Sequence, residues 1–148
     1  MNQNQPLSTN KYPTKKEILT HNQLHTKEHS KIVTTWKKDH YTSKWKTLTN
    51  HEKLLALAWL AVSLAKGVKI KKDKMWATEL GGPSSPQIFM DEFNPSIISM
   101  LHEIGHVLFG ESELTACVFS VKLFTEIFPT EYSHLTWHGH MLKRNAKT

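Results

Sequence analysis

The segment between Asn94 and Pro129 predicts two apolar helices joined by a tight turn. The first helix, PSIISMLHEIGHVLF, follows Asn94 as its capping residue and places Pro95 at the first helical position. Gly110 ends that helix, and Ser112 can cap the second one, ELTACVFSVKLFTEIF, which Pro129 stops. Since so few residues separate them, the second helix can fold back against the first. One short helix and a frayed basic end are expected beyond Pro129.

Two further helical regions are predicted upstream. Both begin with a threonine followed three residues later by a glutamate, the spacing of a capping box: Thr14 with Glu17, and Thr49 with Glu52. Residues 14–46 carry few apolar side chains, so one or two thin amphipathic helices should lie on the outside of the domain. The segment HEKLLALAWLAVSLAK is apolar on most sides, which predicts a central buried helix with Trp59 in the core.

A small β-sheet is predicted ahead of the apolar helix pair. Val68 and Ile70 alternate with lysines, which is the period of a strand, and residues 87–93 have the apolar density of a second strand. The patterns together predict an α+β fold that is mainly helical. Within it we expect residues 1–13 to be a flexible tail and residues 14–148 to form a single domain.

Length and composition limit the classes of protein to which the chain can belong. Its 148 residues suffice for one domain with a core, and its single cysteine, Cys117, excludes an intrachain disulfide. The polar N-terminus lacks the apolar core of a secretion signal, and the longest apolar run, residues 54–65, is too short to span a bilayer. These features predict a cytoplasmic protein without membrane association, of a size that would also suit a phage or mobile element.

Residues 102–106 read His-Glu-Ile-Gly-His, the pattern H-E-x-x-H, within the first apolar helix. Side chains four positions apart share one helix face, so the imidazoles of His102 and His106 can reach one metal ion. Zn²⁺ accepts imidazole nitrogens, and a catalytic zinc site takes three protein ligands and a water. Glu103 is then placed to take a proton from that water, whose pKa the metal lowers.

The third ligand has two candidates. Ser112 stands at the position where metzincins carry their third histidine, so that ligand set is excluded. Glu113 opens the second helix, which the turn at Gly110 can bring back against the first. Glu111 is the rival carboxylate, but it lacks the downstream E-x-x-A context that Glu113 has.

H-E-x-x-H followed by Glu113-Leu-Thr-Ala resembles the gluzincin pattern of ImmA/IrrE-like metallopeptidases, over roughly residues 87–124. The resemblance implies a zincin-like domain in which His102, His106 and Glu113 bind zinc and Glu103 is the general base. It also implies that Ala116, Phe119 and Ser120 are packing positions of the second helix.

Two other segments bear on this resemblance. Ile88–Asp91 looks like the strand that precedes the family's active-site helix, an edge strand that pairs with an extended substrate in related proteases. Cys117 stands where the family has Asn or Asp, and the six residues between His106 and Glu113 make a short spacing. For the thiol, the sequence leaves open an inert buried role or a position facing the metal.

The sequence therefore predicts a zinc-dependent metallopeptidase that hydrolyses peptide bonds of a protein or peptide substrate. The alternative is a basic protein that binds nucleic acid or another partner, with a structural or vestigial metal site. The net charge of +6 would attract polyanions. Trp36 and Trp45 lie among lysines, a context that suits either base stacking or helix packing.

Several other histidines allow a functional interpretation. His21, His25 and His29 recur every four residues and would form a helical stripe, either a second metal site or a solvated polar face. The C-terminal region offers candidates for stabilising the oxyanion of a hydrolytic reaction, each of which has a packing or surface role as its alternative: Tyr132, His134, His138 and His140.

Overall fold

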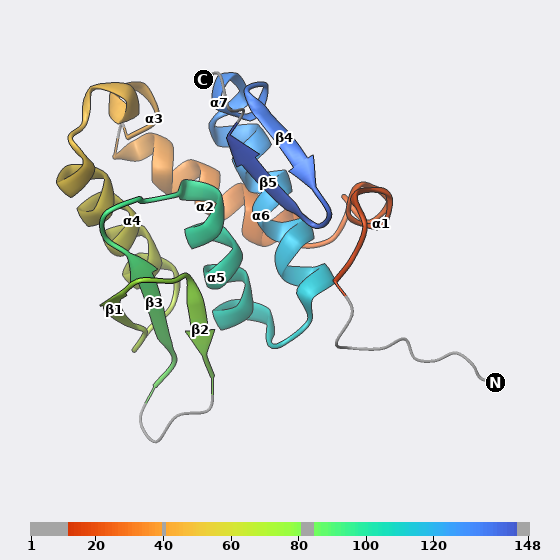
Figure 1. Ribbon diagram of the computed structural model, residues 1–148, viewed down its shortest axis with the longest axis horizontal. Helices are drawn as coiled ribbons and strands as arrows, with labels where there is room; N and C mark the ends of the chain where they lie inside the picture. Colours follow the sequence, from red (N-terminus) through yellow and green to blue (C-terminus); the bar gives the residue numbers. More distant parts are fainter. Residues whose placement is uncertain (1–11, 40, 81–84, 145–148) are drawn as a thin grey trace.

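The structure, a computed structural model, describes residues 12–39, 41–80 and 85–144 (Figure 1). Its helices are α1 (Lys15–Thr20), α2 (Thr26–Lys38), α3 (Tyr41–Lys44), the 3₁₀ turn η1 (Trp45–Thr47), α4 (Asn50–Leu64), α5 (Ile97–Phe109), α6 (Glu113–Ile127) and α7 (Pro129–Tyr132). Its strands are β1 (Lys69–Asp73), β2 (Ala77–Glu79), β3 (Gln87–Asp91), β4 (Leu135–His138) and β5 (Met141–Arg144). The mainly helical α+β fold with a small sheet ahead of α5 is the predicted one. The predicted tail lies outside the described residues except for its last two positions.

The predicted α5–α6 hairpin forms, and it lies at the centre of the fold, the place that the sequence analysis assigns to residues 51–66. Gly110 has a φ of 98°, a conformation that favours glycine, and this allows the chain to reverse between the two helices. The Ser112 hydroxyl accepts a hydrogen bond from the Thr115 amide and so caps α6. The start of α5 differs from the prediction. Ser96 is the capping residue, two positions after Asn94, because its hydroxyl accepts a hydrogen bond from the amide of Ser99.

Gly105 lets α5 and α6 approach closely beside the H-E-x-x-H motif. A Cβ at this buried position would lie 3.1 Å from the Ala116 Cα and 3.2 Å from a Phe119 ring carbon. We therefore expect Gly105→Val to lower the free energy of unfolding by about 1–3 kcal/mol, the usual cost of overpacking a core. Chemical denaturation would measure this, with Ser63→Val on an exposed position of α4 as the control. Equal stability of both variants would contradict it.

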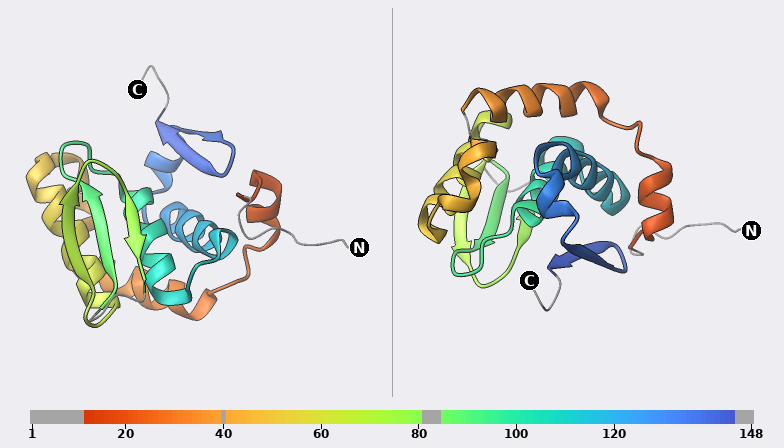
Figure 2. Two further views of the ribbon diagram at one scale, coloured as in Figure 1. Left: turned by 60° about the horizontal axis from the view of Figure 1, so that its bottom comes forward. Right: turned by 90° about the horizontal axis from the view of Figure 1, so that it is seen from above.

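The small sheet has the strand order β1-β3-β2, with β1 parallel and β2 antiparallel to β3. Its inner face carries Ile70, Ile88 and Met90, which join the core with α4 and α5. β3 is the central strand, so the prediction that Ile88–Asp91 is an edge strand is wrong. The edge next to α5 is β2, a strand that the sequence analysis missed (Figure 2).

The helix α4 is less buried than predicted. Its capping box, Thr49 with Glu52, forms as expected. Leu54, Ala56 and Leu57 are among the α4 side chains that pack into the core, but Trp59 is 40% exposed. The prediction of Trp59 as a core residue is therefore wrong. The helix shares the core with the inner face of the sheet and keeps one apolar stripe outside, formed by Leu55, Trp59 and Val62, because α5 and α6 take the most central positions.

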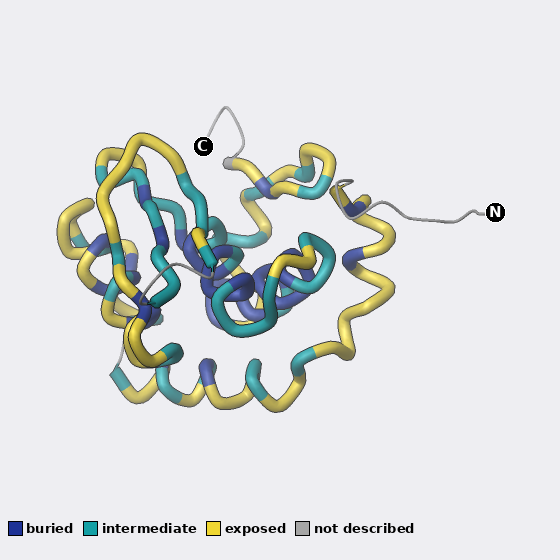
Figure 3. Tube along the Cα trace, turned by 90° about the horizontal axis from the view of Figure 1, so that it is seen from below, coloured by how far each residue is buried: buried dark blue, intermediate teal, exposed yellow. Residues whose placement is uncertain are grey.

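The N-terminal helices wrap around the outside of the α5–α6 pair, as predicted (Figures 2 and 3). The exposed helix α2 contacts α6 and inserts Ile32 and Trp36 into the core. Trp36 and Trp45 are 0% and 7% exposed and contact each other and Phe128. Packing thus explains both tryptophans, which cannot stack on nucleic-acid bases in this conformation.

The C-terminal region forms a short helix, α7, followed by the antiparallel hairpin of β4 and β5. The short helix was predicted and the hairpin was not. Gly139, with a φ of 65°, lies at the turn between the two strands and is followed by His140. Among the described residues, no helix is long and apolar enough to cross a membrane.

Candidate metal centre

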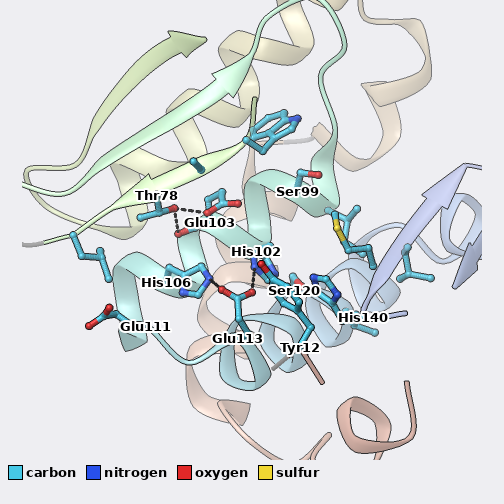
Figure 4. Close-up of a pocket in the computed structure, with 17 residues that line it drawn as sticks. Tyr12, Thr78, Ser99, His102, Glu103, His106, Glu111, Glu113, Ser120 and His140 are labelled. Carbon is cyan, nitrogen blue, oxygen red and sulfur yellow. Dashed lines mark hydrogen bonds and ion pairs between the residues drawn. The ribbon is translucent and has the colours of Figure 1, made fainter. Parts of the chain in front are cut away.

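The side chains of His102, His106 and Glu113 converge between α5 and α6 (Figure 4). The Nε2 atom of His102 lies 3.1 Å from Oε1 of Glu113, and the Nε2 atom of His106 lies 3.0 Å from Oε2. One carboxylate thus contacts both imidazoles. We refer to these three residues as the His–Glu cluster. Within the described ranges it is the one group of three or more potential ligands that meets at a point.

The opposite nitrogen of each imidazole has a partner that orients the ring. Nδ1 of His106 lies 2.8 Å from the carbonyl oxygen of Gly110, to which an N–H at that position donates. Nδ1 of His102 lies 3.7 Å from Sγ of Cys117. With the protons on Nδ1, both Nε2 atoms present lone pairs to the centre of the cluster. Such partners fix the tautomer of metal-binding histidines.

The spacing of the cluster fits a metal ion with nitrogen and oxygen ligands. A tetrahedral ion at about 2.0–2.1 Å from each ligand would separate neighbouring ligand atoms by about 3.3 Å. The observed contacts of 3.1 and 3.0 Å are close to this, and all candidate ligand atoms lie within 4.8 Å of one another. Side-chain adjustments that bring the ligand atoms, which lie up to 4.8 Å apart, to metal-bond geometry would therefore accommodate an ion.

Glu103 lies beside the cluster but outside the ligand group. It is 8% exposed, and the hydroxyl of Thr78 on β2 donates to its Oε1 at 2.5 Å. Thr78 pairs in register with Ile88, so it lies on the sheet face that is turned toward α5. This bond holds one carboxylate oxygen and leaves the other for a further partner. The sequence analysis did not identify Thr78, because its contact with Glu103 joins two residues that lie 25 positions apart in the chain.

The rival carboxylate, Glu111, is exposed and is not a member of the His–Glu cluster. It lies in the turn before α6, whereas Glu113 is in the first turn of that helix, which aims its side chain at α5. In Figure 4 the Glu111 side chain lies to one side, away from the two imidazoles. The geometry therefore favours Glu113.

A cavity of about 780 Å³ opens over the cluster. Its wall comes from β2, from the cluster-facing sides of α5 and α6, from the β4–β5 hairpin and from Tyr12. Glu103 and all three members of the His–Glu cluster line it. A cavity of this size can hold several residues of an extended peptide.

Among the C-terminal candidates, His140 is the one that lines this cavity. Its ring stacks on Tyr12 with a centroid separation of 4.1 Å and an interplanar angle of 8°. Burial, followed by the nearby His102 ring, lowers the pKa of His140, so its ring is neutral near pH 7. His134 and His138 are exposed, and Tyr132 packs against the core.

The predicted stripe of His21, His25 and His29 does not form. His21 follows the end of α1, and His25 has a positive φ of 61° at the start of α2, so the three do not share one helix. His25 stacks on Phe109 instead, with a centroid separation of 3.8 Å. The prediction of a continuous stripe is wrong because the chain turns between the two helices.

Cys117 is buried, and its thiol stays protonated. Burial, followed by the negative charges of Glu113 and Glu103, raises the pKa of Cys117 to about 12. A thiolate is the form that binds metals, so the protonated thiol acts here as a neutral packing group. Its Sγ also lies 3.8 Å from the His140 carbonyl oxygen, which links His102 to the hairpin.

The protonation of the cluster gives a testable pH dependence. Burial lowers the pKa of His106, but hydrogen bonds with Glu113 and Gly110 outweigh it, and the pKa ends above 6.5. Hydrogen bonds from His102 and then His106 hold the pKa of Glu113 far below its ordinary value. Protonated His106 stabilises the metal-free fold below its unfolded-state pKa, and this stabilisation is lost as the pH rises through the raised folded-state pKa.

A metal must displace that proton, so we expect zinc affinity to rise between pH 6 and 8 with proton release from His106. Glu113 should release none in this range, because its pKa is already low. Calorimetric titration in two buffers of different ionisation enthalpy measures the number of protons released. An affinity that is independent of pH, with no proton release at pH 6.5, would contradict this assignment.

Comparison of the chain with protein-family models, with curated proteins and with solved structures gives no match. The chemistry of the site therefore rests on the residues themselves.

Proposed function

We propose that the protein is a zinc-dependent metallopeptidase that cleaves peptide bonds of a protein substrate. One observation carries the proposal: the His–Glu cluster and the buried carboxylate of Glu103 share one cavity on two adjacent helices. Two imidazoles and one carboxylate form the ligand set of a catalytic zinc site that keeps one position for water. The resemblance to ImmA/IrrE-like metallopeptidases points to the same reaction and the same residue roles.

Zinc bound to the cluster would polarise a substrate carbonyl and lower the pKa of a bound water. Glu103 is the group that takes the proton from that water and returns it to the leaving amine. The Thr78 hydroxyl donates to one oxygen of its carboxylate, which leaves the other oxygen to act on the water.

The edge of β2 supports an extended peptide as the substrate. β2 is an edge strand that hydrogen-bonds to β3 on one side, and its residues Ala77 and Thr78 line the cavity together with the preceding Trp76. An extended segment can add to such an edge through main-chain hydrogen bonds. This would place a peptide bond across the His–Glu cluster.

His140 is the side chain we assign to the oxyanion that forms on the attacked carbonyl. It lies in the same cavity, on the hairpin opposite β2, and its stacking on Tyr12 fixes the ring plane. The neutral imidazole retains one N–H that can donate to a developing negative charge. Thr78 and His140 thus act from opposite walls of the cavity.

A direct test uses a denatured, proteome-derived peptide library incubated with the zinc-loaded protein. Mass spectrometry of new termini should show cleavage that a chelator removes and added zinc restores. The metal-free protein serves as the matched control from the same preparation. An absence of new termini, with zinc bound at one ion per chain, would overturn the proposal.

The alternative of nucleic-acid binding stays a prediction from charge alone. The exposed lysines Lys71, Lys72 and Lys74 support it, whereas the burial of Trp36 and Trp45 removes the base-stacking argument. Binding that weakens steeply with salt would be its signature.

A further inference from the structure

The cavity has an apolar end that the proposed mechanism does not use. It is formed by residues from three elements, which we call the apolar shelf: Ile98 of α5, Val121 of α6, and Met141 and Leu142 of β5. Val121 and Leu142 are 6% and 7% exposed and form the floor, while Met141 at 42% forms the rim. An exposed methionine on the wall of a cavity is adaptable and suits contact with an apolar group.

The packing of the two central helices places the shelf at one side of the His–Glu cluster. Ile98 lies one turn before His102, and Val121 lies two turns after Glu113. The helices reverse direction at Gly110, so both residues lie toward the same end of the pair. Figure 4 agrees, since Ser99 and His140 appear on one side of the cluster and Glu111 on the other.

The chemistry of the shelf selects its ligand. Within the described part of the chain, the cavity is lined by carboxylates but by no lysine or arginine, so it offers no cationic Lys or Arg side chain to an acidic side chain. The polar neighbours of the shelf, Ser99 and Ser120, are small, and the Ser120 hydroxyl donates to the Cys117 carbonyl. At the apolar shelf, a ligand therefore gains binding free energy mainly by burying apolar surface.

We propose that the apolar shelf is the subsite for the side chain next to the scissile bond, and that it selects a leucine- or methionine-sized side chain. This inference rests on the proposed peptidase function and adds the class of substrate. It predicts cleavage next to one kind of apolar side chain.

The test compares three small hydroxamates with the zinc-loaded protein. Acetohydroxamate reports metal binding alone. A succinyl hydroxamate with an isobutyl side chain should bind about tenfold tighter than its carbamoylmethyl analogue, which has a similar shape but is polar. Met141→Gln should remove most of this preference and leave acetohydroxamate binding unchanged. Met75→Gln, at an exposed methionine that does not line the cavity, is the matched control.

A second readout separates this inference from the zinc proposal. The methyl signals of ¹³C-labelled methionines should show that the isobutyl compound perturbs Met141, in zinc-loaded and in metal-free protein. A shift of the Met141 methyl signal without acetohydroxamate binding would support the apolar shelf as a binding site and contradict the proposed zinc site. Equal affinity for the two side chains, or an unperturbed Met141 signal, would overturn the shelf even with zinc bound.

Discussion

Replacing Glu103 by glutamine is expected to abolish peptide hydrolysis while the protein still binds its metal. The amide keeps the size of the carboxylate, and its oxygen can still accept the hydrogen bond from Thr78. It has no basic oxygen with which to take a proton from water. Since general-base catalysis contributes about 10²–10⁴-fold, turnover should fall by at least that factor. Library cleavage and metal content of the same preparation would measure both effects.

Glu111→Gln is the matched control, because it makes the same chemical change at a carboxylate that lines the cavity outside the His–Glu cluster. Its turnover should stay within about threefold of the unmodified protein, the scale of a surface change. Cleavage that survives Glu103→Gln unchanged would show that another group activates the water. Loss of activity in both variants would point to an electrostatic effect of the cavity and not to a base.

The candidate centre could be predicted from the sequence because its geometry is local. His102 and His106 share a helix face by their spacing alone, and Gly110 and Ser112 mark a turn that returns Glu113 to the same point. No long-range information is needed to bring these three side chains together. The sequence also favours Glu113 over Glu111, because the capping residue Ser112 marks where α6 begins, and the structure agrees.

The rest of the cavity could not be predicted, because it depends on contacts between distant segments. Thr78 reaches Glu103 because β2 joins the sheet on the side of α5, and a strand of three residues has too few positions to show a period. His140 reaches the cavity because it lies on the β4–β5 hairpin, which the sequence analysis missed. The error on Trp59 has a related cause, since an apolar helix can lie at the edge of a small domain that has too little volume to enclose it.

The residues predicted from the sequence and those found only in the structure lie on different parts of the fold. The helix pair carries the His–Glu cluster and the proposed base, Glu103, while the two small β-elements carry Thr78 and His140 on opposite walls of the cavity (Figure 4). Cys117 connects the two parts, because its thiol contacts both His102 and the carbonyl of His140. A change in the hairpin is thus expected to act on the orientation of a candidate ligand.

Replacing His106 by alanine is expected to remove the metal. The variant loses an imidazole that contacts Glu113 at 3.0 Å and leaves only two candidate ligands. Outer-shell replacements already lower metal affinity about 10–100-fold, so the loss of a direct ligand should exceed that range. The unmodified protein should purify with one zinc per chain, and the variant with none.

A thermal shift gives an independent measurement of the same loss. Zinc at 100 times its dissociation constant stabilises the folded state by about 2.7 kcal/mol, so it should raise the melting temperature of the unmodified protein and not that of His106→Ala. His51→Ala, at an exposed histidine in the first turn of α4, is the control and should retain the full shift. Circular dichroism must show that the variant is folded, because His106 also bonds to Gly110. A folded His106→Ala protein that binds zinc as tightly as the unmodified chain would place the metal elsewhere and remove the basis for the peptidase.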